Sequence, residues 1–208
     1  MRMNRFAFMP VLAVLACGGL AAAADQPAGA GAQEEGGEGS GKQQQAGPYY
    51  VQLDGKYGYI NKEGTLIIPP QFDWGDRFAE GFASVKVGDK YGYINGKGGY
   101  LVKPQFEAAW EFSQGLASVK LNGKYGYIDT KGAMVIQPQY EFAWRFSEDR
   151  ARVQQNGLWG FIDKTGKPIT DCEFEEAWDF SEGLARVRTG KPFGYIDPSG
   201  KFVWNPTK

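Results

Sequence analysis

The sequence predicts an all-β fold built from tandem repeats. Three observations predict it: a fixed spacing of identical residues, a composition rich in glycine and aromatic residues, and turn signals between short apolar segments. Identical residues recur every 34 positions between Pro48 and Lys208, without gaps. The recurring glycines form two series, one at Gly58, Gly92, Gly126, Gly160 and Gly194 and one at Gly64, Gly98, Gly132, Gly166 and Gly200. Self-similarity at such a period is the signature of a repeat architecture.

The composition agrees with many short strands joined by tight turns. The chain of 208 residues contains 30 glycines, and aromatic residues make up 15% of it. Both features favour strands and turns over helices. A net charge of −1 creates no global field toward nucleic acid or an anionic membrane, so we expect no nucleic-acid partner.

The sequence lacks residues that acid–base catalysis, zinc binding and disulfide formation usually require. The chain has no histidine, which removes the commonest general base and the commonest zinc ligand. Its two cysteines, Cys17 and Cys172, are too few for an internal disulfide of the repeat region or a Cys-rich metal site. Acidic pairs such as Glu107 and Glu111 have near equivalents in other repeats, whereas a catalytic site is normally unique. We therefore expect no enzyme activity, no catalytic or metal-binding residue and no cofactor.

Each repeat is predicted to contain three strands. The first is the segment 57–60, the second is 66–68, and the third is 82–87, in which apolar and polar residues alternate. The segment 61–64, Asn-Lys-Glu-Gly, fits a type I turn that ends in a left-handed glycine. The connection from the second strand to the third, such as 106–112, is long enough to hold one helical turn.

The repeat domain is expected to span residues 48–208. Its units lie near 56–89, 90–123, 124–157 and 158–191, followed by a partial unit at 192–208. The segment 50–53 aligns with a third strand, so the two ends of the domain together make up a fifth unit. Two architectures fit this pattern, an open curved stack of hairpins and a closed propeller-like ring of five units. The open stack is favoured, because a four-stranded propeller blade usually takes about 40 residues or more.

The run 158–166, Leu-Trp-Gly-Phe-Ile-Asp-Lys-Thr-Gly, resembles the WG β-repeat of bacterial proteins, also called the KWG repeat. The segments 56–60 and 180–185 are similar to other landmarks of that repeat. Three departures occur: the tryptophan is tyrosine or phenylalanine in four of five copies, Cys172 replaces a proline, and Asp149-Arg150 replace Gly-Leu. The resemblance covers nearly all of the repeat domain. It implies an exported repeat module without catalytic residues.

The N-terminal residues are predicted to direct export. Arg2 and Arg5 precede an apolar run at 6–16, which is too short to span a bilayer and suits a secretory signal. Two cleavage sites fit. An A-x-A site gives a signal peptide of residues 1–24, whereas a lipobox ending at residue 16 makes Cys17 the lipidation candidate.

The segment 25–47 is rich in Gly, Ala, Glu and Gln and has no aromatic or β-branched residue. Such a segment buries too little apolar surface to offset its ordering entropy, so we predict a disordered linker. The mature protein is then periplasmic, secreted, or an outer-membrane-anchored lipoprotein. In the last case its N-terminal lipid is its membrane contact.

The first strands carry a row of tyrosines that is either a ligand platform or packing between repeats. Packing is favoured, because a single repeat cannot bury its own faces. The ligand-contact candidates in this row are Tyr57, Tyr59, Tyr91, Tyr93, Tyr125 and Tyr127. Trp110, Trp144 and Trp178 also recur every 34 residues and are predicted to form a ladder in the core. Asp76 takes the equivalent place in the first unit, so the ladder is expected to be imperfect there.

The third strands are predicted to present polar side chains outward, namely Ser84, Lys86, Ser118, Lys120, Arg152, Gln154, Arg186 and Arg188. Arg152, Arg186 and Arg188 are candidate contacts for a carboxylate or phosphate group of a partner. The alternative is a solvated face that discourages edge-to-edge aggregation, and that alternative is favoured.

These patterns predict an exported, non-catalytic repeat module that mediates protein or glycan binding, or scaffolding, in the cell envelope. Two other functions stay open, a carbohydrate-active enzyme and a purely structural spacer. A deep pocket that breaks the repeat symmetry and holds two carboxylates would favour the enzyme. The sequence leaves open whether the partner is a protein or a glycan.

Overall fold

The computed structural model describes residues 47–190 and 192–205. The chain divides into two units, Met1–Lys42 and Gln43–Lys208, and the described residues all belong to the second. The predicted signal peptide, the Cys17 lipidation candidate and nearly all of the predicted linker lie outside the described residues.

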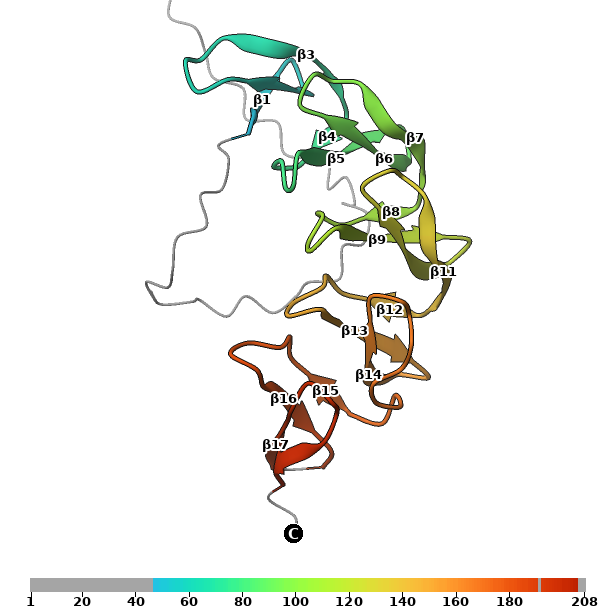
Figure 1. Ribbon diagram of the computed structural model, residues 1–208. Coiled ribbons are helices and arrows are strands. Elements are labelled where there is room, and N and C mark those ends of the chain that lie inside the picture. Colours follow the sequence, from blue (N-terminus) through green and yellow to red (C-terminus); the bar gives the residue numbers. More distant parts are fainter. Residues whose placement is uncertain (1–46, 191, 206–208) are drawn as a thin grey trace, which may run out of the picture. The chain divides into compact units, whose positions relative to one another are not determined.

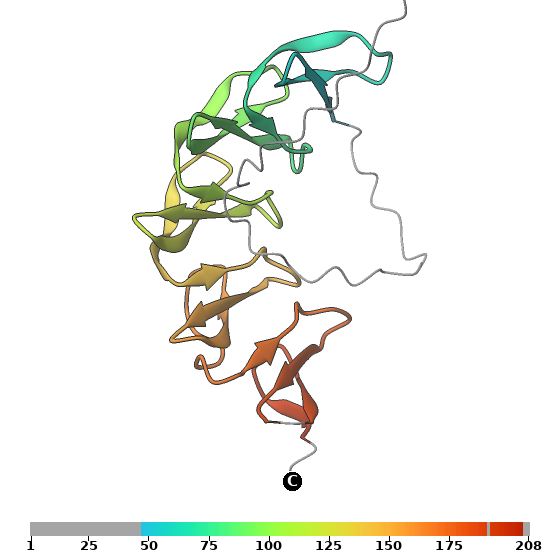
Figure 2. The same ribbon diagram turned by 180° about the vertical axis from the view of Figure 1, so that it is seen from behind.

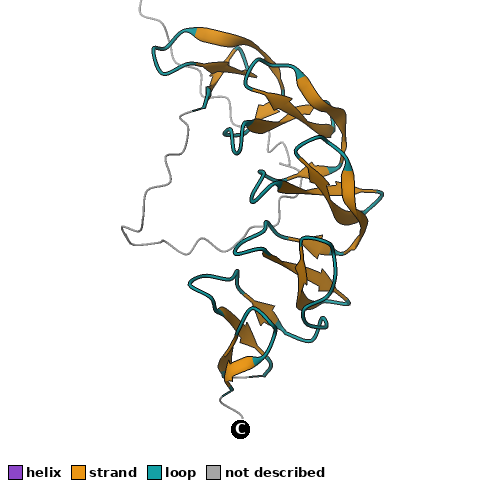
Figure 3. Cartoon of the chain, in the orientation of Figure 1, coloured by secondary structure: helices purple, strands orange, loops and turns teal. Residues whose placement is uncertain are grey.

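The described residues form strands and turns and contain no helix, which confirms the all-β prediction (Figure 3). The helical turn that the connection 106–112 could have held is not found there. That connection instead contains a two-residue strand, β8 (Ala108–Ala109). The main chain pairs with the next strand on both sides of β8: the Glu107 N–H donates to the Lys120 oxygen and the Trp110 N–H to the Ser118 oxygen, both at 2.9 Å.

The strands form five small antiparallel sheets, in each of which neighbours along the chain pair. The first sheet contains β1 (Tyr49–Leu53), β2 (Lys56–Ile60) and β3 (Leu66–Phe72). The second contains β4 (Trp74–Gly75), β5 (Phe82–Val87), β6 (Lys90–Asn95) and β7 (Tyr100–Phe106). The third contains β8, β9 (Leu116–Leu121), β10 (Lys124–Asp129) and β11 (Met134–Tyr140).

The last two sheets follow the same plan with local changes. The fourth contains β12 (Phe142–Ala143), β13 (Arg150–Gln155) and β14 (Leu158–Asp163). Isolated bridges from Trp159 to Phe174 and from Ile162 to Pro168 stand where the other sheets have a last strand. The fifth contains β15 (Glu176–Ala177), β16 (Ala185–Arg188), β17 (Phe193–Ile196) and β18 (Phe202–Trp204).

The tightest hairpins join the third strand of one repeat to the first strand of the next. Both central residues of the turn have positive φ at Asp54-Gly55 (50° and 77°), Asn122-Gly123 (51° and 78°) and Asn156-Gly157 (53° and 75°). Two positive φ angles define the type I′ turn, whose twist matches that of the flanking strands. Each sheet therefore combines strands from two successive sequence repeats.

The predicted turn between the first and second strands is confirmed in the five copies. Its glycine has a φ between 80° and 85° in each. The Oδ1 atom of Asp129 accepts the N–H groups of Lys131 and Ala133, both at 2.9 Å, and this pattern recurs in the other copies. An Asx side chain thus holds the turn from inside.

The glycine in the middle of the first strand is required by a close approach of main chain. A Cβ atom at Gly58 would lie 2.6 Å from the oxygen of Ile68. The register of β2 on β3 shifts between Tyr57 and Tyr59, which pair with Phe72 and Ile68. The main chain of β3 therefore packs directly against β2 at Gly58, where β2 has no side chain.

The hydrophobic core lies between successive sheets. One cluster combines Tyr59 and Ile68 of the first sheet with Ala83, Val85 and Ile94 of the second. Three further clusters join the second sheet to the third, the third to the fourth, and the fourth to the fifth. Each sheet is therefore stabilised mainly by its neighbours, as in other repeat arrays.

The array of described residues is open. β1 pairs with β2, and β18 pairs with β17, so β1 does not complete the last sheet. Within this unit the sheets follow one another in chain order along a curved row (Figures 1 and 2). The favoured open stack is thus found, and the closed ring is not.

Candidate binding surface

The tyrosine row lies largely inside the array. Tyr59, Tyr93 and Tyr127 are 0% exposed. Their hydroxyls donate to main-chain oxygens of the next sheet, at Asp76 (2.9 Å), Trp110 (2.6 Å) and Trp144 (2.7 Å). Burial raises the pKa of all three hydroxyls, so they stay protonated donors. These tyrosines fasten one sheet to the next.

This burial corrects the list of ligand-contact candidates. Tyr59, Tyr93, Tyr127 and the buried Tyr125 are enclosed by packing between sheets, so a ligand has no access to them. Tyr57 and Tyr91 are half-buried. The ring of Tyr57 packs against Trp74 with centroids 5.2 Å apart, and the Lys86 ammonium lies 5.3 Å from the centroid of Tyr91.

The prediction that the third-strand serines point outward is wrong. Ser84 is 3% exposed and Ser118 is 0% exposed. The Ser118 hydroxyl donates to the Ala143 oxygen at 2.8 Å, and Arg152, at the equivalent position, donates from Nη1 to the Ala177 oxygen at 2.6 Å. The acceptor belongs to the next sheet in both cases. This strand position therefore links successive sheets.

The three candidate arginines are already engaged within the protein. Arg152 Nε lies 2.8 Å from the carboxylate of Asp179. The Arg186 guanidinium lies 4.0 Å from the ring centroid of Trp178. Arg188 pairs with Glu176 and with Glu175, the latter at 3.4 Å. A partner would have to compete with these internal contacts.

The recurring tryptophans lie at the edge of the core and not inside it, and Trp110 packs against the cluster that joins the third and fourth sheets. Trp110, Trp144 and Trp178 are half-buried. The centroids of Trp110 and Trp144 are 4.9 Å apart with an interplanar angle of 53°, so the two rings form a continuous aromatic surface. Asp76, in the equivalent place of the first unit, is also half-buried, and burial together with the nearby Glu111 raises the pKa of its carboxyl.

The residues that follow these positions alternate in charge along the array. They are Arg77, Glu111, Arg145 and Asp179, each 34 residues from the next. Arg77 donates from Nε and Nη2 to the Glu111 carboxylate at 2.7 and 2.9 Å. Arg145 donates from Nη1 to the same carboxylate at 2.9 Å, and its Nε lies 3.9 Å from Asp179. We call these four residues the charge ladder.

A second series of contacts ties the turns of successive units together. The Glu80 carboxylate accepts the N–H groups of Gln114 and Gly115 at 2.6 and 2.8 Å. Gln114 accepts the Asp149 N–H in the same way at 2.8 Å, and Glu148 accepts the Gly183 N–H at 2.9 Å. These contacts fix the spacing of the units that carry the tryptophans and the charge ladder.

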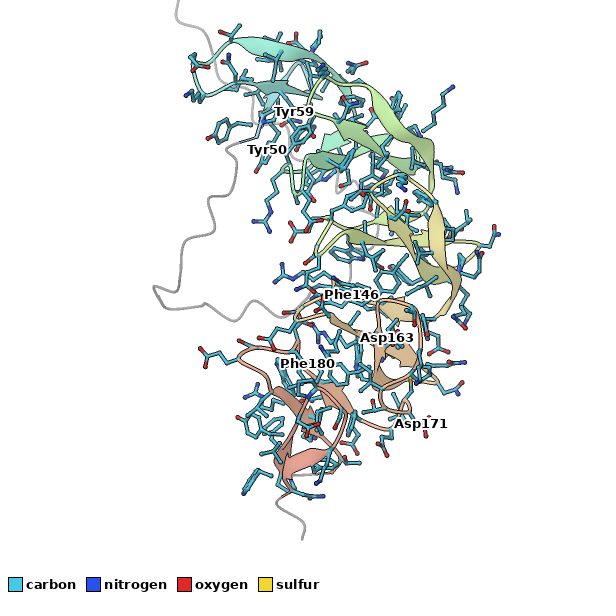
Figure 4. All side chains as sticks on the ribbon, viewed as in Figure 1. Tyr50, Tyr59, Phe146, Asp163, Asp171 and Phe180 are labelled. Carbon is cyan, nitrogen blue, oxygen red and sulfur yellow. The ribbon has the colours of Figure 1, made fainter. Side chains whose placement is uncertain are left out.

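An open hollow of about 420 Å³ lies over this surface. It is lined by Tyr50, Asp76, Arg77, Trp110, Glu111, Trp144 and Arg145. The lining residues come from four successive sheets, beginning with Tyr50 on β1, which Figure 4 shows at the edge of the first sheet. Small-ligand sites typically occupy about 300–1,000 Å³. The hollow is thus of a size to hold a ligand.

The electrostatics of the hollow are set by ion pairs. Burial raises the pKa of Glu111, but its hydrogen bonds to Arg77 and Arg145 outweigh burial and hold the pKa below its usual value. Glu111 is therefore a stable carboxylate between two guanidinium groups. Its exposed side-chain fraction is 18%, compared with 67% for Arg77 and 48% for Arg145. The arginines thus offer free N–H donors to a ligand.

None of the predicted ligand-contact residues lines the hollow. The tryptophans that do line it were assigned to the core, and the charge ladder was not recognised. Within residues 47–190 and 192–205, no group of three or more acidic or cysteine residues could hold a metal ion. No helix that could cross a membrane is found in the same described ranges.

Comparison with known families decides which family the repeats represent. The model of the WG containing repeat matches residues 57–91, 91–125, 125–159 and 159–191. The chain belongs to the WG repeat family. The matches follow one another along the array and cover more than half of the chain, as the resemblance predicted.

Solved structures are only distantly similar. A protein of unknown function from Bacteroides caccae is 15% identical, with a TM-score of 0.35 over 76% of this chain and 77% of its own. The extracellular domain of a putative hybrid two-component system from B. thetaiotaomicron is 12% identical, with a TM-score of 0.37 over 74% of this chain and 27% of its own.

A plant lectin with two metal binding sites from Cicer arietinum is 10% identical, with a TM-score of 0.28 over 66% of this chain and 88% of its own. TM-scores this low support no conclusion about function. A comparison with curated proteins found no match.

Proposed function

We propose that this WG repeat chain is an exported, non-catalytic module that binds a protein or glycan partner in the cell envelope, and that the hollow over Trp110 and Trp144 is its binding surface. The observation that carries the proposal is the exposure of half-buried tryptophans beside ion-paired arginines in one hollow. Tryptophan and arginine are the side chains most enriched where proteins bind partners.

Export rests on the N-terminal sequence. Arg2 and Arg5 followed by a short apolar run fit a secretory signal, with cleavage after residue 24 or before a lipidated Cys17. Expression of the full chain in a bacterium tests this, with the mass of the mature protein as the readout. Loss of residues 1–24, or a diacylglycerol-modified Cys17, supports export, and an intact N-terminus in the cytoplasm contradicts it.

The absence of catalysis rests on the chemistry of the hollow. One of its two carboxylates, Glu111, is held by two arginines and kept ionised, which suits neither a proton donor nor a free nucleophile. Asp76, the other acid of the hollow, has a raised pKa. It is the group to replace in any test for hydrolysis.

The binding role is tested by co-sedimentation of the full chain, carrying Cys17→Ser so that no lipid anchor forms, with cell envelopes isolated from the producing bacterium. The test variant is Trp110→Ala, and the matched control is Trp178→Ala, which removes the equivalent tryptophan outside the hollow. We expect the parent and the control to sediment with envelopes and Trp110→Ala to stay largely in solution. Equal sedimentation of all three would overturn the assignment of the surface, and no sedimentation of any would favour a structural spacer.

A further inference from the structure

The lining of the hollow carries no net charge. Two of its residues are acidic, Asp76 and Glu111, and two are basic, Arg77 and Arg145, with Tyr50 and two tryptophans beside them. Asp76 is followed directly in the chain by the basic Arg77, and Glu111 directly follows the aromatic Trp110. A site of this kind has no electrostatic preference for a cation or an anion.

Donors and acceptors alternate over short distances in the hollow. The Glu111 carboxylate lies within 2.9 Å of nitrogens of both Arg77 and Arg145. A carboxylate only accepts hydrogen bonds and a guanidinium only donates them. A ligand whose groups both donate and accept at neighbouring atoms matches this pattern, and vicinal hydroxyl groups do so without carrying charge.

The aromatic lining of the hollow consists of Tyr50, Trp110 and Trp144. Trp144 is stacked on Phe142 with centroids 5.6 Å apart, and the Arg152 guanidinium lies 5.1 Å from its centroid, so Tyr50 and Trp110 are the rings that a ligand can use. Trp110 and Trp144 lie 4.9 Å apart between centroids, and Tyr50 is 53% exposed. The C–H face of a sugar ring is apolar and flat, whereas its edge carries hydroxyls. The hollow has the same division, with rings on one part of its lining and ion pairs on the other.

The third strands explain why this aromatic surface is open at Trp110 and less so at the later units. The residue beside the tryptophan is Arg152 in one unit and Arg186 in the next, and their guanidinium groups lie 5.1 Å and 4.0 Å from the centroids of Trp144 and Trp178. At Trp110 the equivalent residue is Ser118, which is short and buried. No guanidinium of this series therefore lies over Trp110, whereas one lies over Trp144 in the same hollow.

From these observations we propose that the hollow is a binding site for a neutral sugar, which stacks on Trp110 beside Tyr50 while its hydroxyls bond to Arg77, Glu111 and Arg145. This inference rests on the proposed binding function and names the ligand of the same site. A stretch of protein chain is the competing ligand, and the experiment separates the two.

The test is isothermal titration of the full chain with neutral cello-, malto- and chito-oligosaccharides, and with oligogalacturonate as the acidic counterpart. We expect at least one neutral series to bind with a dissociation constant of about 1 mM or below. Its affinity should change little with salt, because no charge on the ligand is screened. Trp110→Ala and the milder Tyr50→Ala should weaken it, the former at least about tenfold, and Trp178→Ala should leave it unchanged.

Two results would overturn the sugar assignment. One is no binding of any neutral oligosaccharide, and the other is binding of oligogalacturonate alone. If envelopes still bind the chain through Trp110 in that case, and protease treatment of the envelopes abolishes the binding, the partner is a protein and the proposed function stands. If envelopes do not bind either, both the function and the ligand are wrong. Thermal unfolding of each variant identifies any loss that is due to misfolding.

Discussion

At the scale of single residues, the turn glycines of successive repeats share one backbone conformation but differ in the atoms that surround them. Gly64 and Gly132 have nearly the same φ, 80° and 81°. A Cβ atom at Gly64 would meet nothing within 4 Å, whereas at Gly132 it would lie 2.8 Å from a methyl group of Val102 in the preceding sheet. The two positions therefore separate backbone strain from packing between sheets.

We predict that Gly64→Val and Gly132→Val both destabilise the protein, the second more than the first. The left-handed backbone costs roughly 1–2 kcal/mol for a residue with a Cβ atom, and Gly132→Val adds the clash with Val102. Denaturant midpoints measure both. A parental midpoint for Gly132→Val would contradict the turn assignment, and equal losses in the two variants would contradict the packing of this turn on the preceding sheet.

The pKa of Asp76 is raised and that of Asp163 is lowered, so replacing the two aspartates should change the stability in opposite directions. Burial first, and Glu111 in addition, raises the pKa of Asp76 in the folded state, so its charged form costs stability above that raised pKa. The hydrogen bond from the Thr165 side chain lowers the pKa of Asp163, so its charged form adds stability that is lost as the pH falls through the lowered value. Asparagine is accepted at the position of Asp163, since Asn61 and Asn95 occupy the equivalent positions of other units.

Asp76→Asn is therefore expected to raise the melting temperature at neutral pH, and Asp163→Asn to lower it. Both differences should shrink as the pH falls. The Asp76→Asn gain is lost first, as the pH passes through the raised pKa toward the usual aspartate value of about 3.9, and the Asp163→Asn loss persists to lower pH. Thermal melts of the two variants and the parent at several pH values test this. A pH-independent difference for either would show that its carboxyl does not titrate as described.

At the scale of elements, neighbouring units are tied by side chains that reach from one turn to the next. The Glu80 carboxylate holds two N–H groups of the following unit. Glu182 occupies the same place in the last unit, with φ of 53° against 51° for Glu80. Among the described residues no hydrogen bond to the Glu182 carboxylate is found, which makes it a matched control.

We predict that Glu80→Ala lowers the free energy of unfolding by about 1–3 kcal/mol, as expected for hydrogen bonds to a charged group. Glu182→Ala should have an effect close to zero, because the backbone change is the same and no contact is lost. Urea titration of both variants measures the difference. Equal losses would mean that the hydrogen bonds from Glu80 to the following unit do not contribute to stability.

The elements also show which parts of the fold the sequence predicts. Gly132 and its equivalents predict a turn with a left-handed residue, and the strict 34-residue period predicts a repeat array. Asn122-Gly123 is a strong hairpin signal, and it places the sheet across the repeat boundary. The tryptophans misled because aromatic residues at a regular spacing are usually core. Their exposure depends on the packing of one curved sheet on the next, which no single repeat encodes.

At the scale of the whole array, the core clusters join only successive sheets. Stability should therefore be highest in the middle, where a sheet has two neighbours, and lowest at the ends. The burial agrees with this at the C-terminal end, where Tyr195 in the fifth sheet is 38% exposed, compared with 0% for the equivalent Tyr127 in the third. At the N-terminal end Tyr59 is 0% exposed, and the exposure is confined to β1, where Tyr50 is 53% exposed.

Hydrogen exchange of the native protein tests this gradient. We expect the amides of β9 and β10 to exchange most slowly and those of β1, β17 and β18 to exchange fastest, since terminal sheets open without disrupting the middle. A single exchange rate for all protected amides would instead indicate that the five sheets unfold as one cooperative unit.

The charge ladder and the tryptophan surface belong to this scale too, since the hollow draws residues from four sheets. Aligning the repeats in columns would have revealed the alternation of Arg77, Glu111, Arg145 and Asp179. The hollow itself would not have appeared in such an alignment, because Tyr50 and Asp76 break the pattern of the column to which each belongs.

Whether the hollow binds the envelope is decided by the fraction of the Cys17→Ser chain that sediments with isolated cell envelopes, compared between this parent, Trp110→Ala and Trp178→Ala. We predict that the parent and Trp178→Ala sediment alike and that Trp110→Ala, while folded, is lost from the pellet. Sedimentation of folded Trp110→Ala at the parental level would contradict this prediction, because binding would then lie elsewhere on the array.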